Sequence, residues 1–272
     1  MSGRMIPAWS LTAEAAGTIG IPAAWPDRVT RDWAIGGATG EGVDVCILDS
    51  GIDGDHPLVG GVESAVAVHV DGDETTIVPD ELGDVCGHGT ACAGIVRALA
   101  PQCRLHSIRV LGGGNTGSGD LILGGLRHAI ERRFDIVNLS LSTTKRSLAE
   151  LLHELADSAY FQGTVLVASA HNMPVESYPW RFSSVISVGS HEGADSREWY
   201  ANPDPPVEFF ARGVDVDVAW SGGSTLRCTG NSFAAPHIVG LSSLILSKHR
   251  DLTPFQLKSI LYLTAANTGG NE

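Results

Sequence analysis

The chain has 272 residues, of which 43% are hydrophobic and 18% are charged. These proportions are typical of a globular protein with a substantial core, and they exclude disordered and fibrous classes of protein. The 31 acidic and 18 basic residues give a formal charge of −13, which argues against nucleic acid as a partner.

We expect an N-terminal arm over residues 1–20 and a single domain over residues 21–272. In the domain, short runs rich in Val, Ile and Leu alternate with longer helical patterns, which predicts an α/β fold. We expect a central, mainly parallel sheet with helices on both faces. The predicted strands are 43–49, 105–111, 135–140, 164–170 and 185–189, and the predicted helices are 88–99, 120–133, 147–161, 232–248 and 253–265. Residues 190–230 are predicted to form loops with edge strands.

Two of the predicted helices carry further signals. The helix at 232–248 is apolar on nearly every side, so we place it at the centre of the domain. The last helix starts with Thr253 and Pro254, a capping residue followed by proline at the first helical position. These patterns predict one buried helix and one with a well-defined start.

No apolar run in the sequence is long enough to span a bilayer, and residues 1–9 lack the continuous apolar stretch of a signal peptide. We therefore expect no membrane partner and a cytoplasmic location. The five cysteines are odd in number and show no C-x-x-C spacing, so we predict no zinc site and at least one unpaired thiol. Buried free thiols in a reducing compartment fit this pattern.

Three segments place a reactive side chain at the edge of a predicted element. Asp49 ends the strand at 43–49, where open α/β sheets bind their ligands. His88 begins a predicted helix between two glycines, which leave room for an imidazole. Ser232 begins the central helix, whose free N–H groups and positive dipole end suit a developing oxyanion. Taken singly, each residue also fits an ordinary capping or turn position.

Together, the three residues are far more specific. A serine hydroxyl is a poor nucleophile unless a base accepts its proton, and the base needs a buried acid to orient it. Asp49, His88 and Ser232 follow one another in this order along the chain. In these segments the chain resembles the subtilisin-like serine proteases, or subtilases, for which the order Asp, His, Ser is characteristic. The resemblance covers roughly residues 21–265.

The resemblance implies further roles. Asn172 matches the asparagine whose amide helps to bind the oxyanion, although His171 stands where the family usually has glycine. Two segments are implied to bind the substrate backbone, so that a polypeptide substrate is held extended between them. These segments are Gly117, Ser118 and Gly119, and Ser140, Leu141 and Ser142. A polar turn after a strand is the alternative for both.

The sequence also departs from the family at a calcium site. The helix predicted at 88–99 leaves no room for the calcium-binding loop that many relatives insert. Leu58 replaces an aspartate that often binds the same ion, and leucine offers no side-chain oxygen. We therefore expect this calcium site to be absent, and we predict no metal and no cofactor. The acidic stretch 71–74 is predicted to be a solvated turn.

Specificity and regulation are expected to depend on segments near the site. The loop at 173–180 is short for the family and is expected to shape the specificity pocket. Glu176 in this loop either favours a basic substrate residue or is an ordinary surface carboxylate. Cys86 and Cys228 are either reactive thiols beside the site or inert packing. The segment 5–9 faintly resembles an arm with which relatives cover their own active site.

We predict a serine endopeptidase that hydrolyses polypeptides through an acyl-enzyme on Ser232. In this mechanism His88 is the base, Asp49 orients the base, and Asn172 binds the oxyanion. If the acyl-enzyme were passed to an amine, the protein would be a peptide ligase or macrocyclase, and a protease dedicated to precursor peptides is a related alternative. A third hypothesis is an inactive scaffold that only binds peptides. The complete triad argues against the scaffold, and the sequence shows no inserted lid that would keep water from a ligase site.

Overall fold

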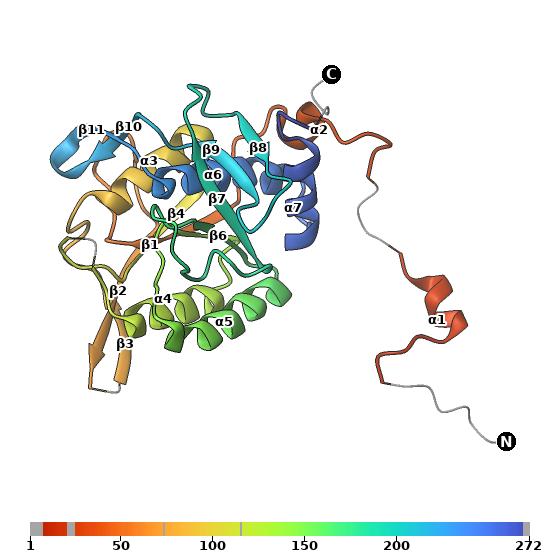
Figure 1. Cartoon of the computed structure of the whole chain (residues 1–272), viewed down its shortest axis with the longest axis horizontal. Helices are drawn as coiled ribbons and strands as arrows, with labels where there is room; N and C mark the ends of the chain where they lie inside the picture. Colours follow the sequence, from red (N-terminus) through yellow and green to blue (C-terminus); the bar gives the residue numbers. More distant parts are fainter. Residues whose placement is uncertain (1–7, 21–24, 73, 115, 269–272) are drawn as a thin grey trace.

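The computed structural model describes residues 8–20, 25–72, 74–114 and 116–268 (Figure 1). The strands are β1 (Asp44–Asp49), β2 (Ser64–Asp71), β3 (Glu74–Pro79), β4 (Arg104–Arg109), β5 (Ile136–Leu139), β6 (Val165–Ser169), β7 (Val185–His191), β8 (Trp199–Ala201), β9 (Phe209–Arg212), β10 (Val216–Trp220) and β11 (Ser224–Cys228). The helices are α1 (Ala13–Thr18), α2 (Arg31–Ile35), α3 (His88–Leu99), α4 (Gly119–Glu131), α5 (Ala149–Gln162), α6 (Asn231–Lys248) and α7 (Pro254–Leu263).

Within the described residues, nine strands form one sheet in the order β3-β2-β4-β1-β5-β6-β7-β9-β8. Neighbouring strands from β2 to β9 are parallel, whereas β3 and β8 pair antiparallel at the two edges. Strands β10 and β11 form a separate antiparallel hairpin. This order places β1 in the interior of the sheet, with Asp49 at its carboxyl end.

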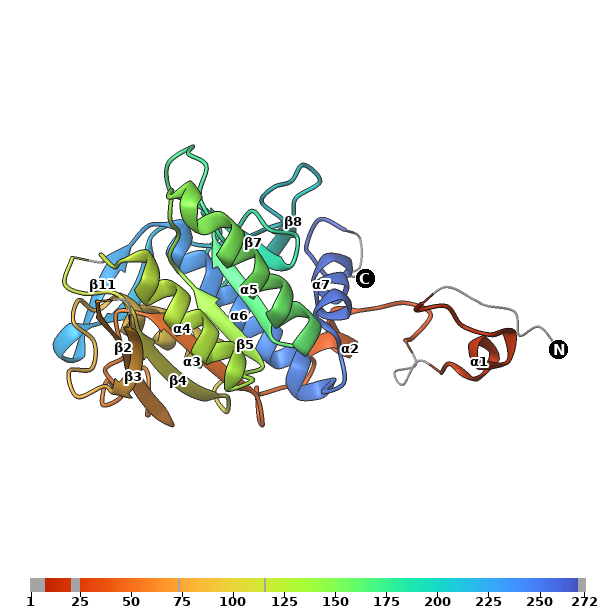
Figure 2. The same cartoon turned by 90° about the horizontal axis from the view of Figure 1, so that it is seen from below.

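Alternating side chains of the interior strands supply apolar surface to both faces of the sheet. In β1, Val45 and Ile47 belong to the core that includes residues of α3, α6 and α7. Cys46 and Leu48 belong to the core that includes residues of α4 and α5. Figure 2 shows α4 and α5 on one side of the sheet and α6 on the other. The predicted α/β class, with a mainly parallel sheet covered on both faces, is confirmed.

Helix α6 is the buried central helix that the sequence predicted. Its residues 233–246 are all buried, and it packs against β5, β6, β7 and α3. The contact with α3 is close, because a Cβ at Gly240 would lie only 2.7 Å from the Cβ of Leu99. Glycine is therefore required where these two helices meet. The first turns of this closely packed pair carry His88 and Ser232.

The structure contains elements that the sequence pattern did not predict, namely α1, α2 and the β2–β3 hairpin. The hairpin strands are only partly buried, so they lack the unbroken apolar run of the interior strands. Asp71 and Glu74, at the two ends of the acidic stretch 71–74, pair at the end of this hairpin, and Asp73 lies outside the described residues. Gly72 has a φ of +59°, a conformation that favours glycine in such a turn.

The described part of the N-terminal segment, residues 8–20, lies apart from the sheet in Figure 1. It contains α1, none of whose residues is buried and whose start is capped by the Thr12 side chain. The division into an arm and a domain stays a prediction, and residues 5–7 of the proposed inhibitory segment lie outside the described residues. None of the described helices has both the length and the hydropathy that crossing a membrane requires.

The buried imidazole of His237 predicts a loss of stability in acid. Burial, opposed in part by a hydrogen bond to the Phe233 carbonyl, lowers the pKa of His237 to about 4. The unfolded chain should titrate this group near the ordinary value of about 6.5. Because the unfolded state then binds more protons at intermediate pH, the free energy of unfolding should fall by roughly 2–3 kcal/mol between pH 7 and pH 4.5 through this group.

Chemical denaturation of the wild type and of His237→Gln at both pH values measures this contribution. The glutamine amide can still donate to the Phe233 carbonyl but does not titrate. The variant should therefore lose less stability than the wild type as the pH falls. Equal losses in the two proteins would contradict the prediction.

Candidate active site

A cleft of about 450 Å³ opens where β5 and β6 end. Its described lining residues are His88, Leu111, Thr116, Gly117, Gly119, Ile122, Ser140, Leu141, Ser142, Thr143, Lys145, Ser169, Ala170, His171, Asn172 and Ser232. The carboxyl ends of parallel strands are the usual ligand-binding edge of such sheets. The cleft brings together His88, Asn172 and Ser232, which come from three separate parts of the chain.

Asp49 lies beneath this cleft and binds the imidazole of His88. The Nδ1 atom of His88 is 2.8 Å from Oδ1 of Asp49 and 3.0 Å from Oδ2. Asp49 is fully buried, and its Oδ1 also accepts a hydrogen bond from the backbone N–H of Ser50. A buried carboxylate favours a proton on the facing Nδ1, so Nε2 of His88 is left as an acceptor.

The turn before α3 is organised by the carboxylate of Asp84. Oδ1 accepts hydrogen bonds from the Ser50 hydroxyl and from the backbone N–H groups of Cys86 and Gly87. Oδ2 accepts from both the backbone N–H and the hydroxyl of Thr90. Asp84 thus satisfies N–H groups at the start of α3 from outside the helix, and so fixes the place where the helix begins.

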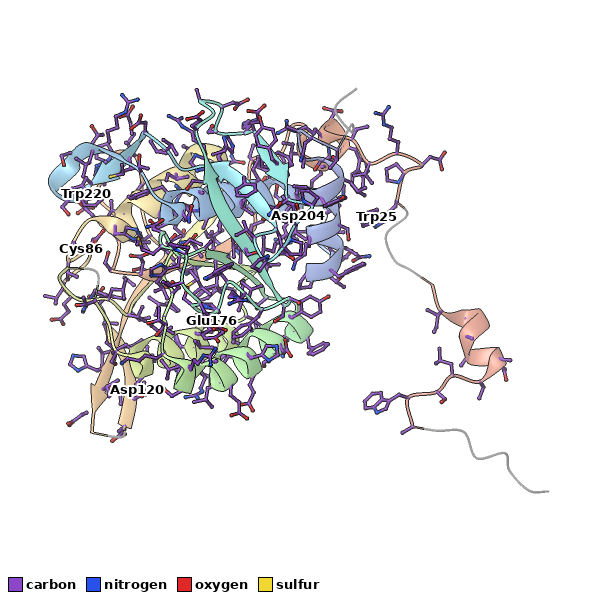
Figure 3. All side chains as sticks on the ribbon, viewed as in Figure 1. Trp25, Cys86, Asp120, Glu176, Asp204 and Trp220 are labelled. Carbon is purple, nitrogen blue, oxygen red and sulfur yellow. The ribbon has the colours of Figure 1, made fainter. Side chains whose placement is uncertain are left out.

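The glycines on either side of His88 are both required by close contacts. Gly87 has a φ of +93°, and a Cβ there would lie 2.8 Å from the ring of Trp220, which is labelled in Figure 3. A Cβ at Gly89 would lie 2.0 Å from the carbonyl oxygen of Gly51. Glycine is therefore required on both sides of His88 because a side chain would meet Trp220 or the Gly51 backbone, which is a different reason from the predicted room for the imidazole.

The environment of His88 favours its protonated form. Burial is the largest influence and acts to lower the pKa of His88, whereas the negative charge and hydrogen bond of Asp49 act to raise it. The charge of Asp84 acts in the same direction as Asp49, and the net effect raises the pKa of His88 above its ordinary value. The ring of Phe233 packs beside the imidazole at 5.4 Å between centroids.

Ser232 is the second residue of α6, and hydrogen bonds to its backbone carbonyl oxygen fix its position. The hydroxyl of Ser140 donates a 2.7 Å hydrogen bond to the Ser232 carbonyl oxygen, and Asn138 donates in turn to this hydroxyl. The buried thiol of Cys92 also contacts the same carbonyl at 3.7 Å. The Ser140 side chain, in a segment that the resemblance implies binds the substrate backbone, therefore helps to fix Ser232 within the protein.

The side chain of Asn231 connects the start of α6 to β7 and to the loop after β6. Its Oδ1 accepts hydrogen bonds from the N–H and the hydroxyl of Ser190, at 2.9 and 2.7 Å. Its Nδ2 donates to the carbonyl oxygens of Ala170 and His171. Its backbone N–H donates to Oδ1 of Asn172 at 2.9 Å. Asn231 therefore sets the position of the loop after β6 relative to α6.

This contact orients the amide of Asn172. Since Oδ1 of Asn172 faces the Asn231 N–H, its Nδ2 is turned the other way. A Cβ at Gly230 would lie 3.4 Å from Oγ of Ser232 and 3.5 Å from Nδ2 of Asn172, so both atoms border the same small space. His171, the departure from the family pattern, forms a local turn in which its Nδ1 accepts from the Met173 N–H.

The segments assigned to substrate binding lie on the cleft, with one exception. Gly117 and Gly119 line one side, and Ser140, Leu141 and Ser142 line the other. The Ser118 hydroxyl instead caps α4 by accepting a hydrogen bond from the Leu121 N–H, at 3.4 Å. Its side chain is therefore a helix cap.

Glu176 lies in a pocket beside this cleft and is paired within the protein. Its carboxylate accepts a hydrogen bond from Arg146 at 2.7 Å and another from the Tyr178 hydroxyl, and Arg181 lies 3.5 Å away. The hydrogen bond from Arg146 is the largest cause that lowers the pKa of Glu176. Of the two interpretations from the sequence, the paired surface carboxylate fits these contacts.

One group of three candidate metal ligands occurs among the described residues: Asp49, His88 and Cys92. Burial raises the pKa of the Cys92 thiol well above its ordinary value, so it stays protonated and is a poor metal ligand. Two of the three groups already bind each other. Cys46, Cys92 and Cys103 are buried free thiols, and Cys86 and Cys228 are half-buried.

Sequence reasoning missed Asp84 and Asn231 as site residues. Asp84 stands in the short segment before a predicted helix, and Thr90 follows in the first turn, so a search for helix caps could have found it. Asn231 immediately precedes Ser232, but its partners are distant in sequence, and no local pattern indicates them.

A buried acid bound to a histidine, with a serine at a helix N-terminus in the same cleft, is the arrangement of a serine hydrolase. A model of the subtilase family matches residues 40–272. The chain is 32% identical over 270 residues to subtilisin DY from Bacillus licheniformis, covering 92% of each chain. It is 32% identical over 253 residues to subtilisin from Bacillus pumilus, covering 86% of this chain and 88% of that one.

A solved structure, described as a cold-adapted subtilisin-like serine proteinase, matches with a TM-score of 0.69 at 24% identity. The match covers 86% of this chain and 88% of the other, and the fold is therefore subtilisin-like. The chain belongs to the subtilase family. It is a serine endopeptidase with an Asp–His–Ser triad, and its substrates are polypeptides.

The contacts around His88 predict the effect of removing the Asp84 charge. Asp84→Asn keeps the size of the side chain but removes a negative charge that raises the pKa of His88, so that pKa should fall. An NMR titration of the imidazole measures it, with His88→Ala used to assign the signal. Asp55→Asn, which removes the same charge at an exposed position, should leave the titration unchanged because Asp55 is not among the groups that shift the pKa of His88. An unaltered pKa in Asp84→Asn would be evidence against the prediction.

Proposed function

We propose that Ser232 is the nucleophile of this endopeptidase, that His88 is its general base, and that Asp49 holds the base in the required tautomer. The observation that carries the proposal is the 2.8 Å contact between His88 Nδ1 and a buried oxygen of Asp49, below a cleft that His88 shares with Ser232. With Nδ1–H donating to Asp49, the lone pair of Nε2 can accept the serine proton.

In the first half of the reaction, Oγ of Ser232 forms a bond to the scissile carbonyl carbon while its proton passes to Nε2 of His88. The imidazolium then gives this proton to the leaving nitrogen as the C–N bond breaks, which releases the amine and leaves an ester on Ser232. In the second half, water gives a proton to Nε2 and adds to the ester carbonyl. The bond to Oγ breaks, the serine proton returns, and the acid product leaves.

The oxyanion that forms in each half needs preorganised donors. We assign this role to Nδ2 of Asn172 and to the backbone N–H of Ser232. The amide of Asn172 is already oriented by the Asn231 N–H, and Ser232 lies in the first turn of α6, where N–H groups have no partner within the helix. Donors that are fixed before the reaction stabilise the transition state without reorganisation.

The substrate is held as an extended strand between the two walls of the cleft. The wall at Gly117 and Gly119 and the wall at 140–142 both line the cleft. Backbone groups of such segments can pair with an added peptide strand. Pairing through the backbone fixes the scissile carbonyl beside Ser232 whatever the side chains of the substrate.

A fluorophosphonate probe tests the assignment of the nucleophile. The wild type should be labelled at Ser232, whereas Ser232→Ala should show neither labelling nor peptidase activity. Mass spectrometry of a defined peptide should show fragments that have gained one water, as hydrolysis requires. Circular dichroism of the variant controls for folding. Labelling that persists in a folded Ser232→Ala protein would overturn the assignment.

A double-mutant cycle tests the link between Asn231 and Asn172. Asn172→Ala should lower kcat by about 10²–10³-fold, the size known for the oxyanion-hole asparagine of subtilisin. Asn231→Ala should lower kcat by about tenfold or more with little change in KM, because it releases the loop that carries Asn172. In the Asn172→Ala background the same change should have a much smaller effect, since the donor is already absent.

Active-site titration and thermal unfolding of each variant separate this effect from a loss of folded protein. Asn231→Asp is a matched control, because it keeps the acceptor for Ser190 and loses the two donors to Ala170 and His171. Its effect on kcat should be intermediate. Fully multiplicative losses in the double variant would show that Asn231 acts independently of Asn172.

A further inference from the structure

The cleft beside Ser232 carries an excess of positive charge in a strongly acidic protein. Lys145 lines the cleft with an exposed side chain, and none of the described lining residues is an aspartate or a glutamate. No ion pair of the described residues involves the Lys145 ammonium. With a formal charge of −13 over the whole chain, this local surplus is a distinctive feature of the site.

The acidic side chain in the pocket next to the cleft does not offset this charge. Glu176, labelled in Figure 3, is bound by Arg146 and lies 3.5 Å from Arg181. Two guanidinium groups therefore already share its single negative charge. The three cations, Lys145 included, outnumber the carboxylate around this end of the cleft.

The cleft also presents polar groups near the ends of two strands. Ser142 and Thr143 lie in the loop that follows β5, whereas Ser169 ends β6 and His171 lies in the loop after it. The backbones of Thr143 and Tyr178 exchange two hydrogen bonds of 2.9 Å, which join the loop after β5 to the loop after β6. Beside the apolar side chains of Leu111, Ile122 and Leu141, the cleft thus offers hydroxyl and imidazole groups and the Lys145 ammonium, which together can bind an anionic side chain.

We propose that Lys145 gives this endopeptidase a preference for substrates with an acidic residue, Glu or Asp, directly before the scissile bond. The inference rests on the proposed function, because a scissile carbonyl held between Ser232 and Asn172 directs that side chain between the walls at 140–143 and 169–172. The long, flexible arm of lysine can reach the carboxylate of either acid. A basic residue in this position meets like charge and finds no free carboxylate among the described lining residues.

The test uses peptide p-nitroanilides that differ in the last residue, which is Glu, Asp, Gln, Phe or Lys. Gln is the neutral match of Glu, so the ratio of their kcat/KM values isolates the charge. The wild type should cleave the Glu substrate about tenfold faster than the Gln substrate, and this ratio should shrink as salt is raised. Lys145→Met should bring the ratio close to one. Lys145→Glu should reverse the preference in favour of the Lys substrate.

Arg127→Glu is the matched control, since Arg127 is exposed on α4 and is not among the lining residues. It changes the net charge as Lys145→Glu does and should leave the Glu/Gln ratio unaltered. A wild-type ratio of one or less, or a ratio that survives Lys145→Met, would overturn the inference while labelling of Ser232 still supports the proposed function. Failure of both labelling and cleavage in the wild type would overturn the proposed function itself.

Discussion

A carboxylate that is removed from water must find partners, and in this protein that requirement is met by the bond between Asp49 and His88. Asp49 is fully buried at the end of an interior strand, where an unpaired charge would be strongly destabilising. The imidazole therefore has to lie directly above it. The start of α3 is fixed accordingly by the five hydrogen bonds to Asp84 and by glycine on both sides of the histidine.

The interior of the fold was predictable because local patterns and tertiary burial agree there. The strands that became β1, β5 and β6 are short apolar runs buried on both faces, and the even apolar coverage of α6 placed it correctly at the centre. The β2–β3 hairpin was missed because its burial depends on position at the sheet edge. A half-exposed strand next to charged turn residues has a weak hydrophobic pattern in the sequence, even when it pairs regularly within the sheet.

The residues of the candidate site likewise fall into those that the sequence predicted and those that it missed. Asp49, His88 and Ser232 were found because each stands at the boundary of a regular element, in segments that resemble a known family. The role of Asn231 depends on acceptors and donors at the ends of other strands, and no sequence pattern specifies such distant partners. The hydroxyl of Ser140, in a segment that the resemblance assigned to the substrate backbone, binds the Ser232 carbonyl, and no sequence pattern indicated this contact. Residues that position others were harder to predict than residues that react.

The glycine contact between α6 and α3 has a consequence for how this enzyme can change over evolution. Because Gly240 lets α6 and α3 pack in direct contact, the proposed base and nucleophile lie on two helices that form one closely packed unit. Much of the cleft lining belongs to the loops after β5 and β6, outside that unit. Selectivity can therefore drift through loop substitutions while the reacting atoms keep their spacing. Altering the helix contact would instead disturb catalysis for every substrate at once.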